Sequence, residues 1–488
     1  MIAVIFLGGL VLRALMLFST KSLWGDEVYS VNFSFNKSVL DVILHCFETN
    51  HPPLHSLFLS LITKFFGGQE VMFRSLSFVP GVLTVWLVYL LARRLFDKPA
   101  AIAASLMAAL SPYLLQSSNE IRAYSLVACL STLVLFFMLK SIKKNKYTPT
   151  YVFLSALLPY VEHMGVFVFI ATTTCLVLTK EKKMFVPQCV VFFLQIPWAL
   201  LVAYQAVYHE KIFQVARVSE YWNAPWILKK GVGIFWHLVC GYQFSMLTVQ
   251  NVLQKLKTDP QFWLQAVVVL MTAAVLAKAF AVLFKTRSHA FYLFVFIFLL
   301  PFLLLLVFYP IRLSARYLSF SAPLFFVVVG YGFAALKPRP LKILCLGALC
   351  VSNFAADLHM IALKTDAIHK SDFRGMVEYV SKASHEHTII VGSQKVYRYY
   401  VGQSKLRNDL VSYDDPKDLD RSNTQGASEI WILKEINMHP KVTDRIIGEY
   451  SAYLRQLGFA EQKRIRFGGE EGLTMAVLYI KETTGAPG

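Results

Sequence analysis

Residues 290–309 read AFYLFVFIFLLPFLLLLVFY, a stretch without a charged side chain. Its length matches the roughly 20 apolar residues that a helix needs to cross a lipid bilayer. Ten further segments have a similar character, so the chain is predicted to be a multi-span α-helical membrane protein with about eleven transmembrane helices. The predicted spans are 2–20, 71–93, 99–117, 121–139, 150–161, 164–179, 185–207, 262–285, 290–309, 315–336 and 340–361, and 150–161 crosses only if it is tilted or extended by its flanks.

The composition agrees with this fold class. Of the 488 residues, 56% are hydrophobic and 16% are charged, whereas an ordinary soluble domain has about 25% charged residues. A soluble multi-domain enzyme, a disordered chain and a coiled coil are therefore excluded. The first segment has neither a basic region before it nor a small-residue cleavage site after it, so it is predicted to be a retained anchor. The seven cysteines lie mostly in apolar spans and are expected to be small buried residues.

The basic residues indicate the topology. Alternate loops contain sixteen Lys and Arg and only two acidic residues, Asp97 and Glu181, which leaves a charge of +14 of the total +18. By the positive-inside rule these loops are cytoplasmic, and the protein is expected in the cell (inner) membrane. A nucleic-acid partner is not expected, because that function requires the basic residues to cluster on a soluble module. The sixteen are Arg93, Arg94, Lys98, Lys140, Lys143, Lys144, Lys146, Lys180, Lys182, Lys183, Lys278, Lys285, Arg287, Lys337, Arg339 and Lys342.

The opposite, extracytoplasmic side then receives two loops of about fifty residues, 21–70 and 208–260, and everything after 362. Residues 1–362 are predicted to form the membrane module, and residues 363–488 a small extracytoplasmic α/β domain. In that domain the patterns predict helices at 372–383 and 442–457 and strands at 388–391, 429–433 and 473–480. This domain is expected to shape an acceptor site or to bind a partner.

Polar residues gather where the predicted spans reach the outer surface. The first cluster is Trp24-Gly25-Asp26-Glu27, directly after the first span. One interpretation makes Asp26 the N-cap of a surface helix, with Glu27 in its first turn. The other makes Asp26 a general base, since a carboxyl beside an indole and an apolar span is partly desolvated.

The second cluster, 50–54, reads Asn-His-Pro-Pro-Leu and opens an amphipathic stretch that is typical of a helix lying along the membrane interface. His51 either caps this helix or hydrogen-bonds a phosphate or a sugar.

Three further clusters follow: 119–124 (NEIRAY), Glu162-His163, and Arg312 with Arg316-Tyr317. In the first of them, Glu120 and Tyr124 are expected on one helical face and Arg122 on another. Arginine suits a phosphate group, although a buried Arg–Glu pair is an equal alternative. All five clusters fall on the predicted outer side, which indicates one site facing an anionic, lipid-linked donor.

These residues resemble a known group of enzymes. Trp24-Gly25-Asp26-Glu27 together with His51-Pro52-Pro53-Leu54 resembles the first extracytoplasmic loop of the GT-C superfamily glycosyltransferases. Residues 120–126 (EIRAYSL) resemble a Glu/Ala-Arg-x-Tyr segment, and Arg316-Tyr317 followed by 321–324 (SAPL) resembles a later Arg-Tyr…Pro segment. The resemblance is to the dolichyl-phosphate-mannose–protein mannosyltransferase-like bacterial enzymes, which include the lipid A aminoarabinose transferases. It covers most of the first 180 residues, and the rest loosely.

The resemblance implies an inverting transferase that moves a sugar from a polyprenyl phosphate to a hydroxyl of a lipid, glycan or protein. Asp26 would deprotonate that hydroxyl, and Glu27 would support it or help to hold a divalent cation (Mg or Mn) where one is used. Arg122, Arg316 or both would neutralise the phosphate that leaves. The sugar or acceptor pocket would be lined by His51, Glu120, Tyr124, His163 and Tyr317.

Two other classes of protein remain as alternatives. A transporter or flippase also has ionisable residues in its spans, but it typically has polar or broken spans near the midplane and two related halves. A non-catalytic membrane scaffold gives no reason for acids, imidazoles and guanidiniums to gather at one surface. The transferase is therefore the preferred hypothesis, with its site defined by the convergence of Asp26 and the outer arginines.

Overall fold

The computed structural model consists of two compact units, which are described separately. Unit 1 comprises residues 1–18 and 33–359, and unit 2 comprises residues 19–32 and 360–488. The first loop thus begins in the same unit as the C-terminal residues. The structure describes the chain except for 20, 36, 50, 209–223, 242–256, 258, 309–313, 363–371, 386, 392–399, 401–411, 414–418, 421–423, 425, 436–439, 468–473 and 482–488.

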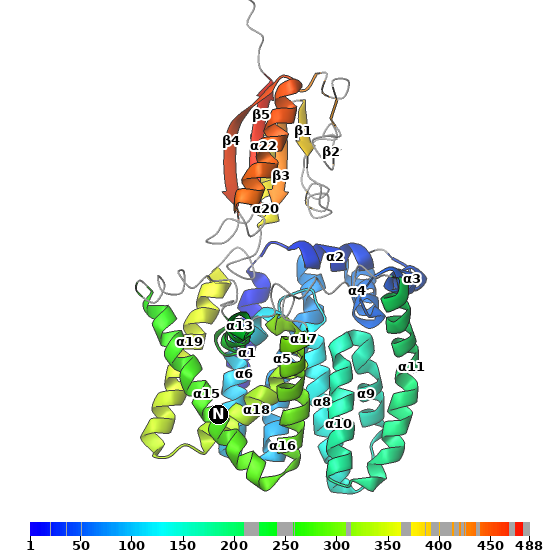
Figure 1. The fold of residues 1–488 in the computed structure, drawn as a ribbon, viewed down its shortest axis with the longest axis vertical. Coiled ribbons are helices and arrows are strands. Elements are labelled where there is room, and N and C mark those ends of the chain that lie inside the picture. Colours follow the sequence, from blue (N-terminus) through cyan, green and yellow to red (C-terminus); the bar gives the residue numbers. More distant parts are fainter. Residues whose placement is uncertain are drawn as a thin grey trace, which may run out of the picture. The chain divides into compact units, whose positions relative to one another are not determined.

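Unit 1 is a helical bundle, and each of the eleven segments predicted to span the membrane is helical (Figure 1). By length and apolarity, six helices of the described residues are able to cross a membrane. They are α5 (Glu70–Leu95), α8 (Tyr124–Lys144), η2 (Lys182–Met184) with α11 (Phe185–Tyr208), α15 (Pro260–Thr286), α16 (His289–Leu293) continued by η5 (Phe294–Leu299) and α17 (Leu300–Phe308), and α19 (Arg339–Ala362). The total of eleven crossings stays a prediction.

The other predicted spans are shorter helices, and two of them are interrupted. They are α1 (Ile2–Phe18), α6 (Lys98–Ala109) followed by α7 (Pro112–Ser117), α9 (Pro149–Val161), η1 (His163–Gly165) with α10 (Val166–Leu178), and η6 (Ala315–Leu318) followed by α18 (Ala322–Ala334). Segment 99–117 breaks because the Ser111 side chain accepts the Leu114 N–H and Pro112 starts a new helix. A further helix, α13 (Ala224–Cys240), lies within the 208–260 segment, most of which is outside the described residues.

The core of unit 1 centres on α18, which packs against α5, α6 and α15. Nearly every side chain of α18 is buried, including Phe325, Phe326 and Phe333. The approach of α6 is close, since a β-carbon on Gly330 would lie 2.6 Å from the backbone nitrogen of Ala104. A small residue is therefore required where these two helices cross.

One buried arginine connects three helices of the bundle. Arg13 of α1 is 1% exposed, and its guanidinium donates to the carbonyl oxygens of Gly9, Ala108 and Ala109. It also interacts electrostatically with Asp357 of α19. Its charge is therefore paired inside the bundle, as is usual for an ionisable group within a membrane protein.

The two ends of the bundle differ in character. Helix α8 has the candidate residue Tyr124 at its first position and Lys143 and Lys144 in its last turn, so about 30 Å of helix separate them. Two of the basic loops meet at the lower end in Figure 1, where His289 Nε2 lies 3.5 Å from Glu181 Oε1. The basic residues thus lie at the end opposite to the 119–124 and 162–163 clusters.

The first loop contains three helices, α2 (Gly25–Ser34), α3 (Val39–Glu48) and α4 (Pro53–Phe66). Helix α4 begins with Pro53 after the N-cap Pro52, and its Gly67 C-cap has a positive φ of 83°. It buries a polar face and exposes Leu61, Phe65 and Phe66. An exposed apolar face is what the predicted interfacial position requires.

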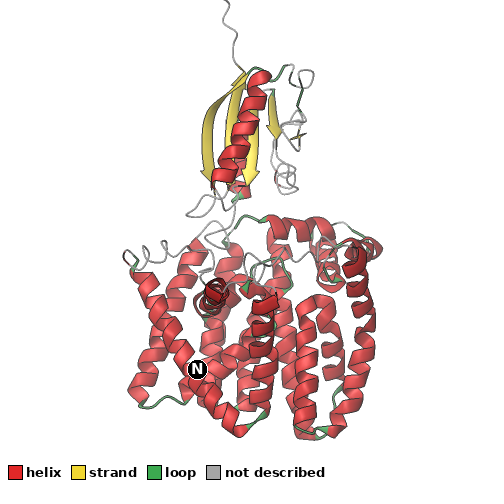
Figure 2. Ribbon diagram, in the orientation of Figure 1, coloured by secondary structure: helices red, strands yellow, loops and turns green. Residues whose placement is uncertain are grey.

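Unit 2 contains a five-stranded sheet in the order β2-β1-β3-β5-β4 (Figure 2). Strand β1 pairs in parallel with β2 and β3, while β5 pairs antiparallel with β3 and β4. The small C-terminal sheet expected from the sequence is therefore present. The elements are α20 (Phe373–Ala383), β1 (Thr388–Val391), β2 (Ser412–Tyr413), β3 (Glu429–Glu435), α22 (Pro440–Gln456), β4 (Phe459–Phe467) and β5 (Thr474–Lys481).

Both faces of this sheet are covered by helices. Ile430 and Ile432 of β3 pack with Ile447 and Leu454 of α22. The alternate residue Trp431 is 1% exposed, and its ring lies 6.2 Å from that of Tyr379 in α20. A strand that is buried on both faces reads as a continuous apolar run, which is why 430–433 (IWIL) was recognisable in the sequence.

Candidate functional site

The turn before α8 differs from its predicted form. Residues 118–123 form turns and bends, and α8 begins only at Tyr124. The Arg122 N–H donates to the carbonyl oxygen of Glu120 (2.8 Å), which breaks the helical pattern. The prediction of a shared helical face for Glu120 and Tyr124, with Arg122 pointing elsewhere, is therefore wrong. The Arg122 guanidinium instead lies 5.8 Å from the centre of the Tyr124 ring.

Arg122 and Arg316 come from distant parts of the sequence and converge at one place. Both guanidiniums act electrostatically on the Glu162 carboxyl and on the Tyr124 hydroxyl. The backbone places Arg122 just before α8, Arg316 in η6, and Glu162 at the end of α9. Burial raises the pKa of Glu162, and both arginines act to lower it. Unit 1 thus holds two guanidiniums around one carboxyl at the end opposite to the basic loops.

Glu120 and Tyr317 lie beside this group. Glu120 is 4% exposed, and its carboxylate accepts a hydrogen bond from Gln116 Nε2 (2.8 Å) while also acting electrostatically on Tyr124. The Tyr317 ring centre lies 5.6 Å from the guanidinium carbon of Arg316, so each arginine of the pair contacts an aromatic ring. Arg312, which belongs to the same predicted cluster, lies outside the described residues.

The Glu162-His163 turn is held by a close approach between α9 and η1. A β-carbon on Gly165 would lie 2.7 Å from the backbone carbonyl of Leu158, so only glycine fits there without displacement. Trp198 Nε1 of α11 donates to His163 Nδ1 (3.0 Å). The orientation of the His163 ring is therefore fixed by a residue that the sequence analysis did not single out.

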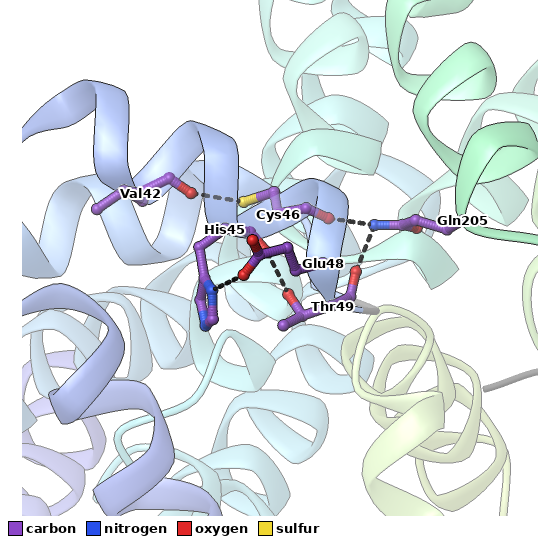
Figure 3. Close-up of polar contacts among 6 residues, drawn as sticks. All are labelled: Val42, His45, Cys46, Glu48, Thr49 and Gln205. Atoms are coloured by element: carbon purple, nitrogen blue, oxygen red, sulfur yellow. Dashed lines mark hydrogen bonds and ion pairs between the residues drawn. The ribbon is translucent and has the colours of Figure 1, made fainter. Parts of the chain in front are cut away.

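His51 follows the end of α3 in the sequence. Figure 3 shows Gln205 of α11 reaching this end, where its Nε2 donates to the carbonyl oxygens of Cys46 (2.7 Å) and Thr49 (2.6 Å). His45 Nδ1 lies 3.0 Å from Glu48 Oε2 beside it. The N-cap residue of α4 is Pro52, so His51 is not the N-cap itself.

His51 faces the positive charge of the arginine group. Burial, followed by the fields of Arg122, His163 and His45, lowers the pKa of His51 to about 3. Burial and Arg122 likewise lower the pKa of His55 to about 3. Both imidazoles are therefore neutral at ordinary pH and offer one donor and one acceptor nitrogen each. His55 lies in the first turns of α4, four residues after His51, and that spacing is the pattern that could have identified it.

Asp26 and Glu27 belong to unit 2 and differ in exposure. Helix α2 begins at Gly25, so Asp26 lies inside its first turn and is not the N-cap. Glu27 is 0% exposed, and its Oε2 accepts the Trp24 N–H (3.2 Å), which is one half of a capping box. Asp26 is partly exposed, and its carbonyl accepts from Ser30 Oγ (3.0 Å). Of the two acids, Asp26 is the one accessible to a substrate.

Among the residues that the structure describes, no three or more His, Cys, Asp and Glu side chains are grouped so as to hold a metal ion. One oxygen of the Glu27 carboxylate, Oε2, accepts the Trp24 N–H. A divalent cation at this pair stays a prediction, and we derive no chemical step through it.

The comparisons with known proteins bear on the arginine and histidine region. Residues 50–208 match the family described as dolichyl-phosphate-mannose-protein mannosyltransferase. The family resemblance predicted from the sequence is thereby confirmed. The matched segment contains His51, Arg122, Glu162 and His163. No curated protein matches the sequence.

Solved structures share the fold over nearly the whole chain. ArnT from Cupriavidus metallidurans bound to undecaprenyl phosphate has a TM-score of 0.54 at 12% identity, with 100% of this chain and 99% of that chain covered. The apo state of that protein gives 0.51, with 98% and 97% covered. The Archaeoglobus fulgidus oligosaccharyltransferase AglB, in complex with an inhibitory peptide and a dolichol-phosphate, gives 0.51 at 11% identity, with 99% and 75% covered. The chain therefore shares the fold of these two proteins.

Proposed function

We propose that this protein is an integral-membrane inverting glycosyltransferase that moves a sugar from a polyprenyl phosphate to an acceptor hydroxyl on the extracytoplasmic side. The observation that carries the proposal is the convergence of Arg122 and Arg316 on one carboxyl in unit 1. Guanidiniums present paired donors that match a phosphate, and their charge stabilises the negative charge that the phosphate gains as it leaves.

The location of this convergence supports a lipid-borne donor. The arginine pair lies at the bundle end opposite to the basic loops, which the positive-inside rule assigns to the cytoplasm. A polyprenyl chain can then lie among the apolar helices and present its sugar phosphate at the outer surface. The structures of ArnT with undecaprenyl phosphate and of AglB with a dolichol-phosphate show that proteins of this fold bind such lipids.

In the proposed reaction Asp26 accepts the proton of the acceptor hydroxyl, and the oxygen attacks the anomeric carbon in line. The bond between that carbon and the phosphate oxygen breaks, and its electron pair leaves with the phosphate toward Arg122 and Arg316. Because the phosphate is a good leaving group, no general acid is required, unlike glycoside hydrolysis, where a second carboxylic acid protonates the leaving oxygen. The neutral imidazole of His51 and the side chains of His163, Glu120, Tyr124 and Tyr317 orient the sugar or the acceptor by hydrogen bonds and ring contacts.

The proposal is tested by transfer of radiolabelled sugar from undecaprenyl phosphate to cell-envelope material, with purified wild-type protein and Asp26→Asn. We expect the wild type to label the envelope material and the variant to be slower by roughly 10²–10⁴-fold, the usual contribution of a general base. The matched control is Asp41→Asn, because Asp41 lies in the same loop but is exposed and only caps α3. Turnover by Asp26→Asn at the wild-type rate would show that Asp26 is not the base. Absence of transfer by the wild type would refute the proposed function.

A further inference from the structure

Unit 2 holds the segment that leads to Asp26. We call Lys21, Ser22, Leu23, Arg374 and Tyr400 the loop-one anchor, because the first three residues precede α2 and the last two belong to the C-terminal part of the chain. Lys21, Ser22 and Leu23 are 1%, 3% and 0% exposed. A loop segment that is buried to this degree is fixed by its contacts, and the contacts come from three places in unit 2.

The first contact is at the end of α19. Lys21 Nζ donates to the carbonyl oxygens of Met360 (2.7 Å) and Ile361 (3.4 Å). The last carbonyls of a helix lack partners within the helix and carry partial negative charge, so a buried ammonium there satisfies both and complements the helix dipole. These contacts offset part of the cost of burying Lys21.

The second contact is at the start of α20. The Arg374 backbone N–H donates to Ser22 Oγ (3.0 Å), and Arg374 Nη2 donates to the Lys21 carbonyl oxygen (3.3 Å). The next N–H of this first turn, that of Gly375, donates to the Asp372 side chain. The loop thus supplies one of the acceptors that the first turn of α20 needs.

The third contact is with Tyr400. Its hydroxyl accepts the Leu23 N–H (2.6 Å), and its ring lies 5.8 Å from the Arg374 guanidinium carbon. Tyr400 is itself 5% exposed. The Leu23 N–H would be a buried donor without this hydroxyl, and a buried donor that loses its partner costs about 1–3 kcal/mol.

The anchor passes directly into the helix that carries the acid. The Trp24 carbonyl, one residue after the anchor, accepts the N–H groups of Glu27 (2.9 Å) and Val28 (3.0 Å), and the Trp24 N–H is held by Glu27 Oε2. Asp26 therefore lies in the first turn of α2, and this turn directly follows the buried residues Lys21, Ser22 and Leu23. No flexible residue separates Leu23 from that turn.

We propose that Arg374 and Tyr400 are positioning residues of the transferase, and that the C-terminal domain holds the acid-bearing turn of the first loop in place. This inference rests on the proposed function of Asp26 as the base. It assigns to the C-terminal domain a role in catalysis that does not depend on contact with donor or acceptor. A displacement of a reacting group by about 1 Å can cost about 10²-fold in rate, so loss of one anchor contact has a measurable effect.

The test uses the full-length protein with Tyr400→Phe and Arg374→Ala. We expect both variants to transfer radiolabelled sugar from undecaprenyl phosphate at least 10-fold more slowly, with unchanged affinity for undecaprenyl phosphate alone, since the proposed phosphate site lies in unit 1. Amide hydrogen exchange of the peptide 21–30 should become faster, because the Leu23 N–H loses its acceptor or its support.

Two controls separate positioning from damage to the domain. Tyr479→Phe removes a hydroxyl of β5 that hydrogen-bonds Ser451 of α22 (2.7 Å), and Arg466→Ala removes an exposed arginine of β4. Both are expected to keep the wild-type rate and the wild-type exchange of 21–30. Equal loss of rate in Tyr479→Phe would show a general effect of domain stability and overturn the proposal.

The remaining outcomes also decide between the claims. If the wild type transfers sugar and the anchor variants match it, positioning is overturned while the proposed function stands. If exchange of 21–30 is unchanged in both variants, the anchor does not fix the loop and the proposal fails. If the wild type transfers no sugar, the function and the inference that rests on it fail together.

Discussion

Arg122 and Arg316 place two fixed positive charges beside one carboxyl whose pKa burial raises. Each guanidinium also lies against the ring of a tyrosine, Tyr124 or Tyr317. Ring contacts of this kind orient a guanidinium without using its N–H donors.

At the residue scale, Arg122→Ala and Arg316→Ala are expected to weaken the use of the polyprenyl-phosphate donor. At least one of them should lower the transfer rate by about 10²–10³-fold, because a donor aimed at developing charge contributes that much. The control is Arg287→Ala, since Arg287 lies in a basic loop with its guanidinium 4.0 Å from the Phe284 ring. Normal binding of undecaprenyl phosphate by both variants would show that neither arginine binds the phosphate.

His55 predicts how stability depends on pH. Burial and Arg122 hold its folded-state pKa at about 3, below the ordinary value of 6.5, so acid protonates the unfolded state first. The stability that neutral His55 supplies is complete above pH 6.5 and is lost as the pH falls toward 3.

We therefore expect His55→Gln to lose less thermal stability than the wild type between about pH 7 and about pH 4.5. The measurement is the shift in Tm between the two pH values within each variant, which cancels the general cost of the substitution. His45→Gln, on the more exposed side chain of α3, is the control and should behave as the wild type. An identical shift in His55→Gln would contradict the pKa of His55.

Residue types and spacing predicted which side chains gather in unit 1, but not how they face one another. Arg122 was expected to point away from Tyr124 because a helical pattern was assumed through 119–124, and the chain instead turns there. Trp198 and Gln205 had no local pattern, since their roles depend on α11 packing beside distant segments. The placement of Asp26 relative to the arginines stays a prediction.

At the scale of elements, the crossing of α6 and α18 depends on Gly330. Gly330→Ala is expected to destabilise the protein, although Gly→Ala inside a helix normally stabilises by about 0.5–1 kcal/mol. Gly347→Ala in α19 is the matched control, because nothing lies within 4 Å of its β-carbon position. Thermal unfolding in detergent should give a lower Tm for the first and an equal or higher Tm for the second. A higher Tm for both would mean that the two helices can move apart.

The elements themselves followed from apolar length and from alternation in the sequence. The breaks within two of the predicted spans did not follow from these patterns. Segment 99–117 contains a Ser-Pro pair that starts a second helix, and segment 315–336 begins with a 3₁₀ turn before α18. In unit 2 the predicted strands 388–391 and 429–433 are present, as is the helix at 373–383. Apolar runs indicate burial more directly than they indicate where one helix ends.

For the whole molecule, the charge asymmetry predicts the orientation in the membrane. In a Cys189→Ser background, Lys144→Cys is expected to react with an impermeant maleimide only after the inner membrane is permeabilised. Gln462→Cys is expected to react while the inner membrane is still intact, once the reagent can enter the periplasm. Both positions are exposed, so access to each side decides the labelling. Labelling of the two positions from the same side would contradict the topology and the outer location of the site.

The grouping of residues 19–32 with the C-terminal unit had no counterpart in the sequence analysis, which divided the chain at 362. No local pattern links Lys21 to Met360 or Leu23 to Tyr400, since these pairs are 339 and 377 residues apart. Side-chain hydrogen bonds over such separations depend on the folded arrangement alone.

This separation has a consequence for biosynthesis. A ribosome adds about 5–20 residues per second, so Leu23 is made roughly 20–75 s before the tyrosine that binds its amide, 377 residues later. During that interval the membrane helices can already be inserted while the turn with the carboxylate has no support from the last domain. An incompletely made or prematurely terminated chain would consequently reach the bilayer with residues 21–23 lacking these contacts, and under the proposed positioning role sugar transfer would begin only after translation is complete.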